Sequence, residues 1–224
     1  MSEFNIEIEV GSSKRLPVGN KWCPEDIIVR AVGEGFDEDV LGDFLSNRLK
    51  KLDCNATKIP TRACQERTSL VSANLPNVTY MGQYAFYKCS NLVTIYAPNL
   101  SSISTYVFRE CTALTEVNFP LLASVPNYTF YLDKALSKAD VGVASSIGSQ
   151  AFYNAPIKTL ILRKSDGICT LSNTDAFASS GIGPKKGNIY VPSALIEEYK
   201  NATNWSTYAS IFRAIEDYPE ICGG

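Results

Sequence analysis

The sequence contains no histidine, and this absence removes several classes of enzyme from consideration. Neither a Ser-His-Asp nor a Cys-His nucleophile can be assembled, and no metal site can use imidazole ligands. No stretch approaches the ~20 consecutive apolar residues of a membrane-spanning helix. Residues 1–7 have neither a basic segment nor an apolar segment of the kind found in a secretory signal peptide. We therefore expect no enzyme, no cofactor, no signal peptide in this chain and no membrane insertion.

An excess of either charge is also missing. The 21 Lys and Arg residues nearly balance the 23 Asp and Glu residues, which leaves a net charge of -2. No nucleic-acid partner is expected, because bulk electrostatics do not favour binding to a polyanion. The 7 cysteines include no C-x-x-C pair, which argues against a zinc ribbon or a dithiol redox site. We expect no metal site, and we expect the cysteines to be buried thiols.

The sequence does contain a tandem repeat of 22 residues. Phenylalanine and leucine each recur with this spacing, and other apolar positions, such as Ala73, Ile95, Val117 and Ala139, follow it too. The two leading columns are Phe86, Phe108, Phe130 and Phe152, and Leu70, Leu92, Leu114 and Leu136. A period of this length is the signature of a solenoid, in which stacked units bury a core that no single unit can bury alone.

Each unit contains a short strand followed by a turn with an Ala-Phe pair. In residues 114–120, Val117 and Phe119 alternate with Glu116 and Asn118, which predicts a strand with an apolar inner and a polar outer face. The Ala-Phe segment predicts a short helical or 3₁₀ turn with its Phe packed into the core. Stacking should pair the strands in parallel, about 4.8 Å apart.

The repeat weakens at both ends, which predicts four segments. Residues 1–36 alternate polar and apolar side chains in two runs, and we expect a small β-hairpin module. Residues 37–56 have apolar residues at helical spacing, which predicts an N-terminal capping helix. The solenoid should span 57–187, and 188–224 should form a last strand and a C-terminal helical cap, with its second helix at about 205–215.

The turns Ala85-Phe86-Tyr87-Lys88-Cys89 and Val107-Phe108-Arg109-Glu110-Cys111, each followed by Leu three residues later, resemble the BspA-type leucine-rich repeat in its A-F-x-x-C-x-x-L form. The resemblance covers about residues 57–218. It implies a right-handed superhelix with short parallel strands. Family members are mostly bacterial surface or secreted adhesion proteins, and some belong to phage particles. Residues 16–29 are similar to strand modules in tail-associated proteins of phages that infect Gram-positive bacteria.

Two surfaces are candidates for binding. The first is formed by the outward positions of the stacked strands, which make one polar face of the kind that solenoids use for ligands. These positions are Ser72, Asn74, Thr94, Tyr96, Glu116, Asn118, Lys138 and Asp140. The second is an aromatic row before the Ala-Phe motif, Tyr84, Tyr106 and Tyr128. Tyrosines can stack on sugar rings or anchor a protein, and the alternative is that these rings only cover the edge of the repeat.

The leading functional hypothesis is a non-catalytic binding module on a phage tail that recognises a host-surface protein or glycan. One alternative is a bacterial cell-surface or secreted adhesin of the same repeat family, and another is a structural component of a particle. All three place the chain in an extracellular setting. Residues 1–36 are candidates for contact with sister subunits or other tail proteins.

Overall fold

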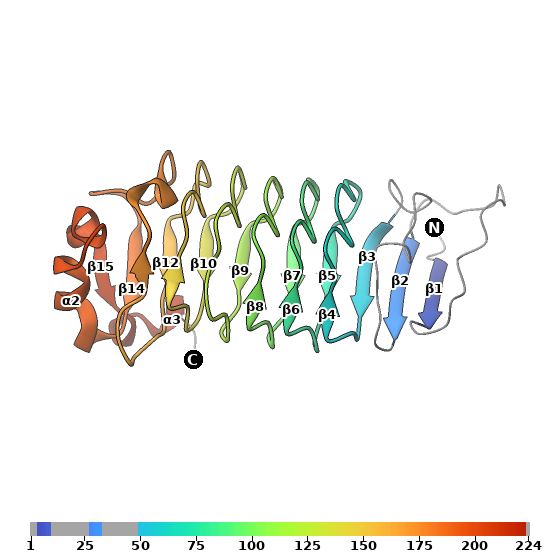
Figure 1. The fold of residues 1–224 in the computed structure, drawn as a ribbon, viewed down its shortest axis with the longest axis horizontal. Coiled ribbons are helices and arrows are strands. Elements are labelled where there is room, and N and C mark those ends of the chain that lie inside the picture. Colours follow the sequence, from blue (N-terminus) through green and yellow to red (C-terminus); the bar gives the residue numbers. More distant parts are fainter. Residues whose placement is uncertain (1–3, 10–26, 33–48, 223–224) are drawn as a thin grey trace.

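The computed structural model describes residues 4–9, 27–32 and 49–222, and shows a stack of coils that follows the order of the sequence (Figure 1). Each coil contributes a short strand to one long face. These strands are β1 (Phe4–Glu9), β2 (Ile27–Val32), β3 (Leu49–Cys54), β5 (Ser72–Asn74), β7 (Thr94–Tyr96), β9 (Glu116–Asn118), β10 (Lys138–Asp140), β12 (Thr159–Ile161), β14 (Asn188–Val191) and β15 (Phe212–Ala214). They form two five-stranded parallel sheets, β1-β2-β3-β5-β7 and β15-β14-β12-β10-β9, so the predicted solenoid of parallel strands is confirmed.

A second set of two-residue strands lines another side of the coils. β4 (Lys58–Ile59), β6 (Tyr80–Met81) and β8 (Ser102–Ile103) form one sheet. β11 (Ser146–Ile147) and β13 (Thr170–Leu171) form another. Between the two sets of strands, the Ala-Phe motifs form tight turns, and the last of them is the 3₁₀ helix η2 (Thr174–Phe177).

The Phe column runs through the core as predicted. Phe86, Phe108, Phe130 and Phe152 are fully buried, and successive rings stack with centroids 5.7, 5.5 and 5.1 Å apart. Phe177 extends the column at 5.5 Å from Phe152. Removing one buried Phe typically costs ~3–5 kcal/mol, so this column is a main source of stability.

The cysteines in the repeat are buried free thiols. Cys89 and Cys111 donate hydrogen bonds from Sγ to the backbone oxygens of Cys64 and Phe86, at 2.9 and 3.1 Å. Burial raises the pKa of Cys89 to about 12. A thiol with a raised pKa in an apolar site is inert, so these residues act as small core side chains.

The expected N-terminal β-hairpin is wrong. β1 and β2 pair in parallel, with Phe4 opposite Ile27, and β2 pairs in parallel with β3. The alternating pattern identified the strands, but a hairpin requires antiparallel neighbours, whereas parallel neighbours need a crossover of a dozen or more residues. The offset from Phe4 to Ile27 is 23 residues, close to the repeat period, so the strand ladder of the solenoid begins at residue 4.

The expected capping helix over 37–56 is wrong where the structure describes it. Leu49–Cys54 is the strand β3, and residues 37–48 lie outside the described residues. The register between β2 and β3 shifts at Lys50, which opposes no residue of β2. Because of this bulge, Leu49 and Leu52 are both buried although they are three residues apart. A spacing of three between buried residues is typical of a helix, which explains the wrong prediction.

The C-terminal segment forms the predicted strand β14, followed by η3 (Ser193–Leu195) and the helix α2 (Ile196–Asn201). The helix expected at about 205–215 ends earlier: a 3₁₀ helix, η4 (Trp205–Ile211), is followed by β15, which pairs with β14. Alternation in Phe212–Ala214, with only Arg213 turned outward, favours the strand. η5 (Ile215–Asp217) and α3 (Pro219–Cys222) are the last described elements. Among the described helices, none has the length and apolar composition needed to cross a bilayer.

Candidate functional site

The structure brings the predicted outward positions together in two columns. Ser72 lies opposite Thr94, and Asn74 lies opposite Tyr96. The same register continues from Glu116 to Lys138 and from Asn118 to Asp140. Asn74, Thr94, Tyr96, Glu116 and Asn118 are exposed, and Ser72 is half-buried.

The strand face is interrupted between β7 and β9, and we call this place the joint. Among the described residues, no ladder pairs these two strands, and one five-stranded sheet ends at β7 and the other at β9. The coils remain joined at their turns, where the N–H groups of Phe108 and Glu110 donate to Thr129 and Tyr131 at 3.0 and 2.9 Å. The joint is therefore open on the strand side and closed on the turn side.

Main-chain groups face this open joint from both strands. The N–H of Phe119 donates to Asp140 on the far side of β9, and the carbonyl of Tyr96 accepts from Leu75 on the far side of β7. Because backbone groups alternate in direction along a strand, those of Glu116 and Asn118 face β7, and those of Ile95 face β9. Without a ladder, these groups are available to a ligand or to water.

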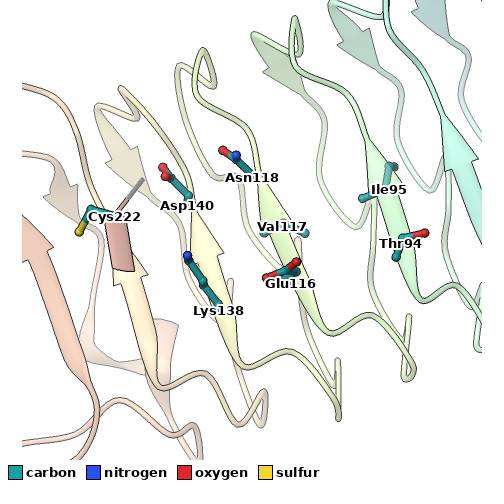
Figure 2. A pocket seen from close by; sticks show the side chains of 8 residues that line it. All are labelled: Thr94, Ile95, Glu116, Val117, Asn118, Lys138, Asp140 and Cys222. Atoms are coloured by element: carbon teal, nitrogen blue, oxygen red, sulfur yellow. The ribbon is translucent and has the colours of Figure 1, made fainter. Parts of the chain in front are cut away.

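A cleft of about 270 Å³ lies at this joint (Figure 2). Side chains from β7, β9 and β10 and from the end of α3 line it: Thr94, Ile95, Glu116, Val117, Asn118, Lys138, Asp140 and Cys222. Ile95 is half-buried, whereas Val117 and Ala139 in the same column are fully buried. The cleft thus combines a small apolar floor with hydroxyl, amide and carboxylate groups.

Lys138 and Asp140 are held by the C-terminal segment. The Nζ of Lys138 donates to the backbone oxygen of Ile221 at 2.6 Å. Asp140 is buried and accepts from Arg163 at 2.6 Å, and Arg163 also donates to the backbone oxygen of Cys222. These two predicted residues therefore attach α3 to the strand face and form one wall of the cleft.

Sequence reasoning missed Arg163 and Cys222 as parts of this wall. A signal was present in the outward column, where Asp140 is followed by Ile161 and Tyr190 in register. Both apolar side chains are buried in a cluster with Cys222, Ile221 and Tyr218. Apolar residues at outward positions indicate that another segment covers that part of a sheet.

The aromatic row is packed against itself. Tyr84, Tyr106 and Tyr128 stack with centroids 4.9 Å apart at both steps, and the guanidinium of Arg62 lies 5.7 Å from the Tyr84 ring. The two faces of Tyr106 and the inner faces of its neighbours are therefore occupied. Tyr106 therefore presents only its ring edge and hydroxyl group to a ligand, and a sugar has no room to stack on this ring or between it and its neighbours.

The side chains of Tyr87, Arg109 and Tyr131, which form a second column next to this row, also contact one another. Arg109 lies between Tyr87 and Tyr131, at 5.8 and 4.7 Å from their ring centroids. Its Nε donates to Glu110 at 3.0 Å. Cation–π contacts and this ion pair stabilise the turn edge of the solenoid and leave little unsatisfied charge on it.

The described residues contain no group of three His, Cys, Asp or Glu side chains that could hold a metal ion. Burial raises the pKa of the Cys222 thiol at the cleft, which is opposite to the shift that a nucleophilic cysteine requires. The cleft is suited to hydrogen bonding and apolar contact.

A family model described as "BspA type Leucine rich repeat region" matches residues 57–182 in 6 copies. No curated protein matches the chain. Among solved structures, a leucine rich cell surface protein from Faecalibacterium prausnitzii A2-165 is similar with a TM-score of 0.58 and 17% identity. The match covers 85% of this chain and 49% of the Faecalibacterium protein, so this chain spans about half the length of that protein. The T. pallidum Leucine Rich Repeat protein (TpLRR) matches with a TM-score of 0.47 and 19% identity, over 87% of this chain and 86% of that one.

Proposed function

The chain belongs to the BspA-type leucine-rich repeat family, and from this premise we propose that it is a non-catalytic binding module that recognises its ligand through the strand face from Ser72 to Asn118. The observation that carries the proposal is the open joint between β7 and β9, where a cleft adjoins exposed polar side chains. Solenoids commonly use such a stacked face for recognition.

Tyr96 is the residue best suited to anchor a ligand on this face. It is 59% exposed, and Asn74 lies opposite it in register. Exposed aromatic side chains with a free face are frequent binding hot spots. The turn edge is less suited, because its tyrosines are already engaged with one another.

The setting that we propose is extracellular, with a host-surface protein or glycan as the ligand. The adhesive character of the family and the cell-surface protein among the similar structures support a place on a bacterial surface. Placement on a phage tail rests on the similarity of residues 16–29, of which 16–26 lie outside the described residues and 27–29 belong to β2. Tail genes beside the coding gene would favour the virion, and surface-protein genes would favour the cell.

Binding of the fluorescently labelled protein to a panel of bacterial and mammalian cells, measured by flow cytometry, tests the proposal. We expect saturable binding that the double substitution Tyr96→Ala, Asn118→Ala weakens about ten-fold or more, as truncation of a hot spot does. Tyr106→Ala on the turn edge is the matched control and should bind like the unmodified protein.

Equal loss of binding in the control would move the site to the turn edge. Absence of binding to every cell type, together with self-assembly of the purified protein, would instead support the structural particle component.

A further inference from the structure

We propose that the cleft between β7 and β9 is a saccharide site that takes a neutral pyranose unit, with Tyr96 as its stacking platform. This inference rests on the proposed function and specifies the chemical class of the ligand. Four observations carry it: the exposed ring of Tyr96 on β7, the polar groups that line the cleft, the width of the joint and the charges at the cleft.

Tyr96 is exposed and stacks on no other described ring, whereas each tyrosine of the aromatic row stacks on a neighbour. It follows the cleft residue Ile95 on β7 and points outward on the same side as the cleft residue Thr94. Its column neighbours are Asn74 and Asn118, so no aromatic residue precedes or follows it at the repeat spacing. One face of a pyranose ring is rich in C–H groups, and such a face packs well on an exposed aromatic ring.

The polar groups that line the cleft match the hydroxyls of a sugar. Thr94 supplies a hydroxyl, Asn118 an amide and Glu116 a carboxylate, which together donate and accept hydrogen bonds. The backbone groups of Ile95, Glu116 and Asn118 that face the open joint add further donors and acceptors. A ligand with many hydroxyl groups can satisfy these partners at once.

The width of the joint argues against an inserted peptide strand. Adjacent strands in a sheet lie about 4.8 Å apart, so a third strand between β7 and β9 needs a separation of about 9.6 Å. The Cα atoms of β7 and β9 approach within 8 Å of each other. The joint therefore admits hydroxyl groups or water, but not a polypeptide backbone.

The charges at the cleft favour a neutral ligand. The guanidinium of Arg163 is paired with Asp140, and Lys138 lies opposite Glu116 in register, so each carboxylate of the cleft has a cation near it. The cleft therefore carries no excess of positive charge that would attract an acidic sugar, and the exposed carboxylate of Glu116 would repel one at close range. Attachment of α3 also fixes the wall that carries Cys222, and a preformed wall lowers the entropy cost of binding.

The test is a glycan array probed with the full chain, followed by titration of the best neutral oligosaccharide in solution. We expect binding to neutral glycans ending in galactose, glucose or N-acetylglucosamine, and weaker binding to their sialylated forms.

Tyr96→Ala should weaken the affinity for the neutral oligosaccharide about ten-fold or more. Tyr96→Phe should retain it, because the ring face remains, and Glu116→Gln should reduce the preference for neutral over sialylated forms. Circular dichroism confirms that each variant is folded.

Tyr106→Ala is again the matched control. Absence of binding to any array glycan, or binding that Tyr96→Ala leaves unchanged, would overturn the saccharide site. If binding to cells still required Tyr96 and free saccharide did not compete with it, the ligand would be a protein and the proposed function would stand. If the chain bound neither cells nor glycans, both proposals would fail.

Discussion

The carboxyl group of Asp133 is completely buried at a position that the preceding coils fill with Cys89 and Cys111. Its Oδ1 accepts from the backbone N–H of Cys111 at 2.8 Å, and its Oδ2 has no hydrogen-bond partner. Burial is the main cause that raises the pKa of Asp133 well above its usual value. The folded protein therefore favours the neutral acid, and its ionisation opposes folding.

Asp133→Asn should stabilise the protein at neutral pH. Because the pKa of Asp133 is raised in the folded state, the contribution of its neutral form to stability is fully present below the pKa of the unfolded chain, about 4. This contribution is lost as the pH rises through the pKa of the folded state. The amide keeps an acceptor for Cys111 and cannot ionise. We expect the free energy of unfolding in urea to increase by about 1–2 kcal/mol at pH 7.

At pH 4 the advantage of Asp133→Asn should largely vanish. Asp175→Asn, at an exposed carboxyl group, is the control and should change stability little at either pH. Equal stability of Asp133→Asn and the unmodified protein at pH 7 would show that this carboxyl group is not forced into a costly state.

The two tyrosine environments also differ at the scale of single residues. The sequence predicted both surfaces without deciding between them, although the repeat itself held the distinction. Tyrosines that recur every 22 residues stack on one another, as Tyr84, Tyr106 and Tyr128 do. Tyr96 has Asn74 and Asn118 at the same position of the adjacent coils, so no neighbouring ring of its column stacks on it.

At the scale of elements, α3 closes the end of the strand face. It covers Ile161 and Tyr190, which are buried at outward positions of β12 and β14. Covering one apolar side chain of this size contributes about 1.5–3 kcal/mol. The short C-terminal helix thus contributes to stability, although it contains only four residues.

Deletion of residues 219–224 should lower the free energy of unfolding by about 2 kcal/mol or more and increase the binding of a dye specific for apolar surface. The cause is exposure of Ile161 and Tyr190. Deletion of 223–224 alone is the control and should leave both quantities unchanged. A longer deletion without effect on the denaturation midpoint would mean that α3 is not attached in solution.

Strands were predictable from the sequence, but their pairing and irregularities were not. The alternation in residues 4–9 predicted a strand correctly, and only the three-dimensional register distinguishes a hairpin from a further coil. At Leu49 and Leu52, a single bulged residue converts the two-residue spacing of a strand into the three-residue spacing of a helix. Local patterns carry no information that resolves such a case.

At the scale of the whole molecule, the 22-residue spacing predicted the solenoid, because Phe and Leu columns can be buried only by stacking. The open joint was not predictable, since the spacing is the same on both sides of it. One local difference marks it: Phe119 is the largest side chain in the column of Leu75, Ala97 and Val141. Its ring stacks on Phe108 of the preceding coil, 5.8 Å away, and its bulk lies at the joint that lacks a ladder.

Amide hydrogen exchange, followed by NMR on the free protein, tests the open joint most directly. Tyr96, Asn118 and Asp140 occupy the same position in successive coils, and each amide points toward the preceding strand. We predict that the Asn118 amide exchanges faster than the other two by an order of magnitude or more. The reason is that β9, which carries Asn118, forms no ladder with the preceding strand β7, whereas β7 and β10 are each paired with the strand before them. Protection of Asn118 equal to that of Tyr96 and Asp140 would show a continuous ladder and contradict the proposed cleft.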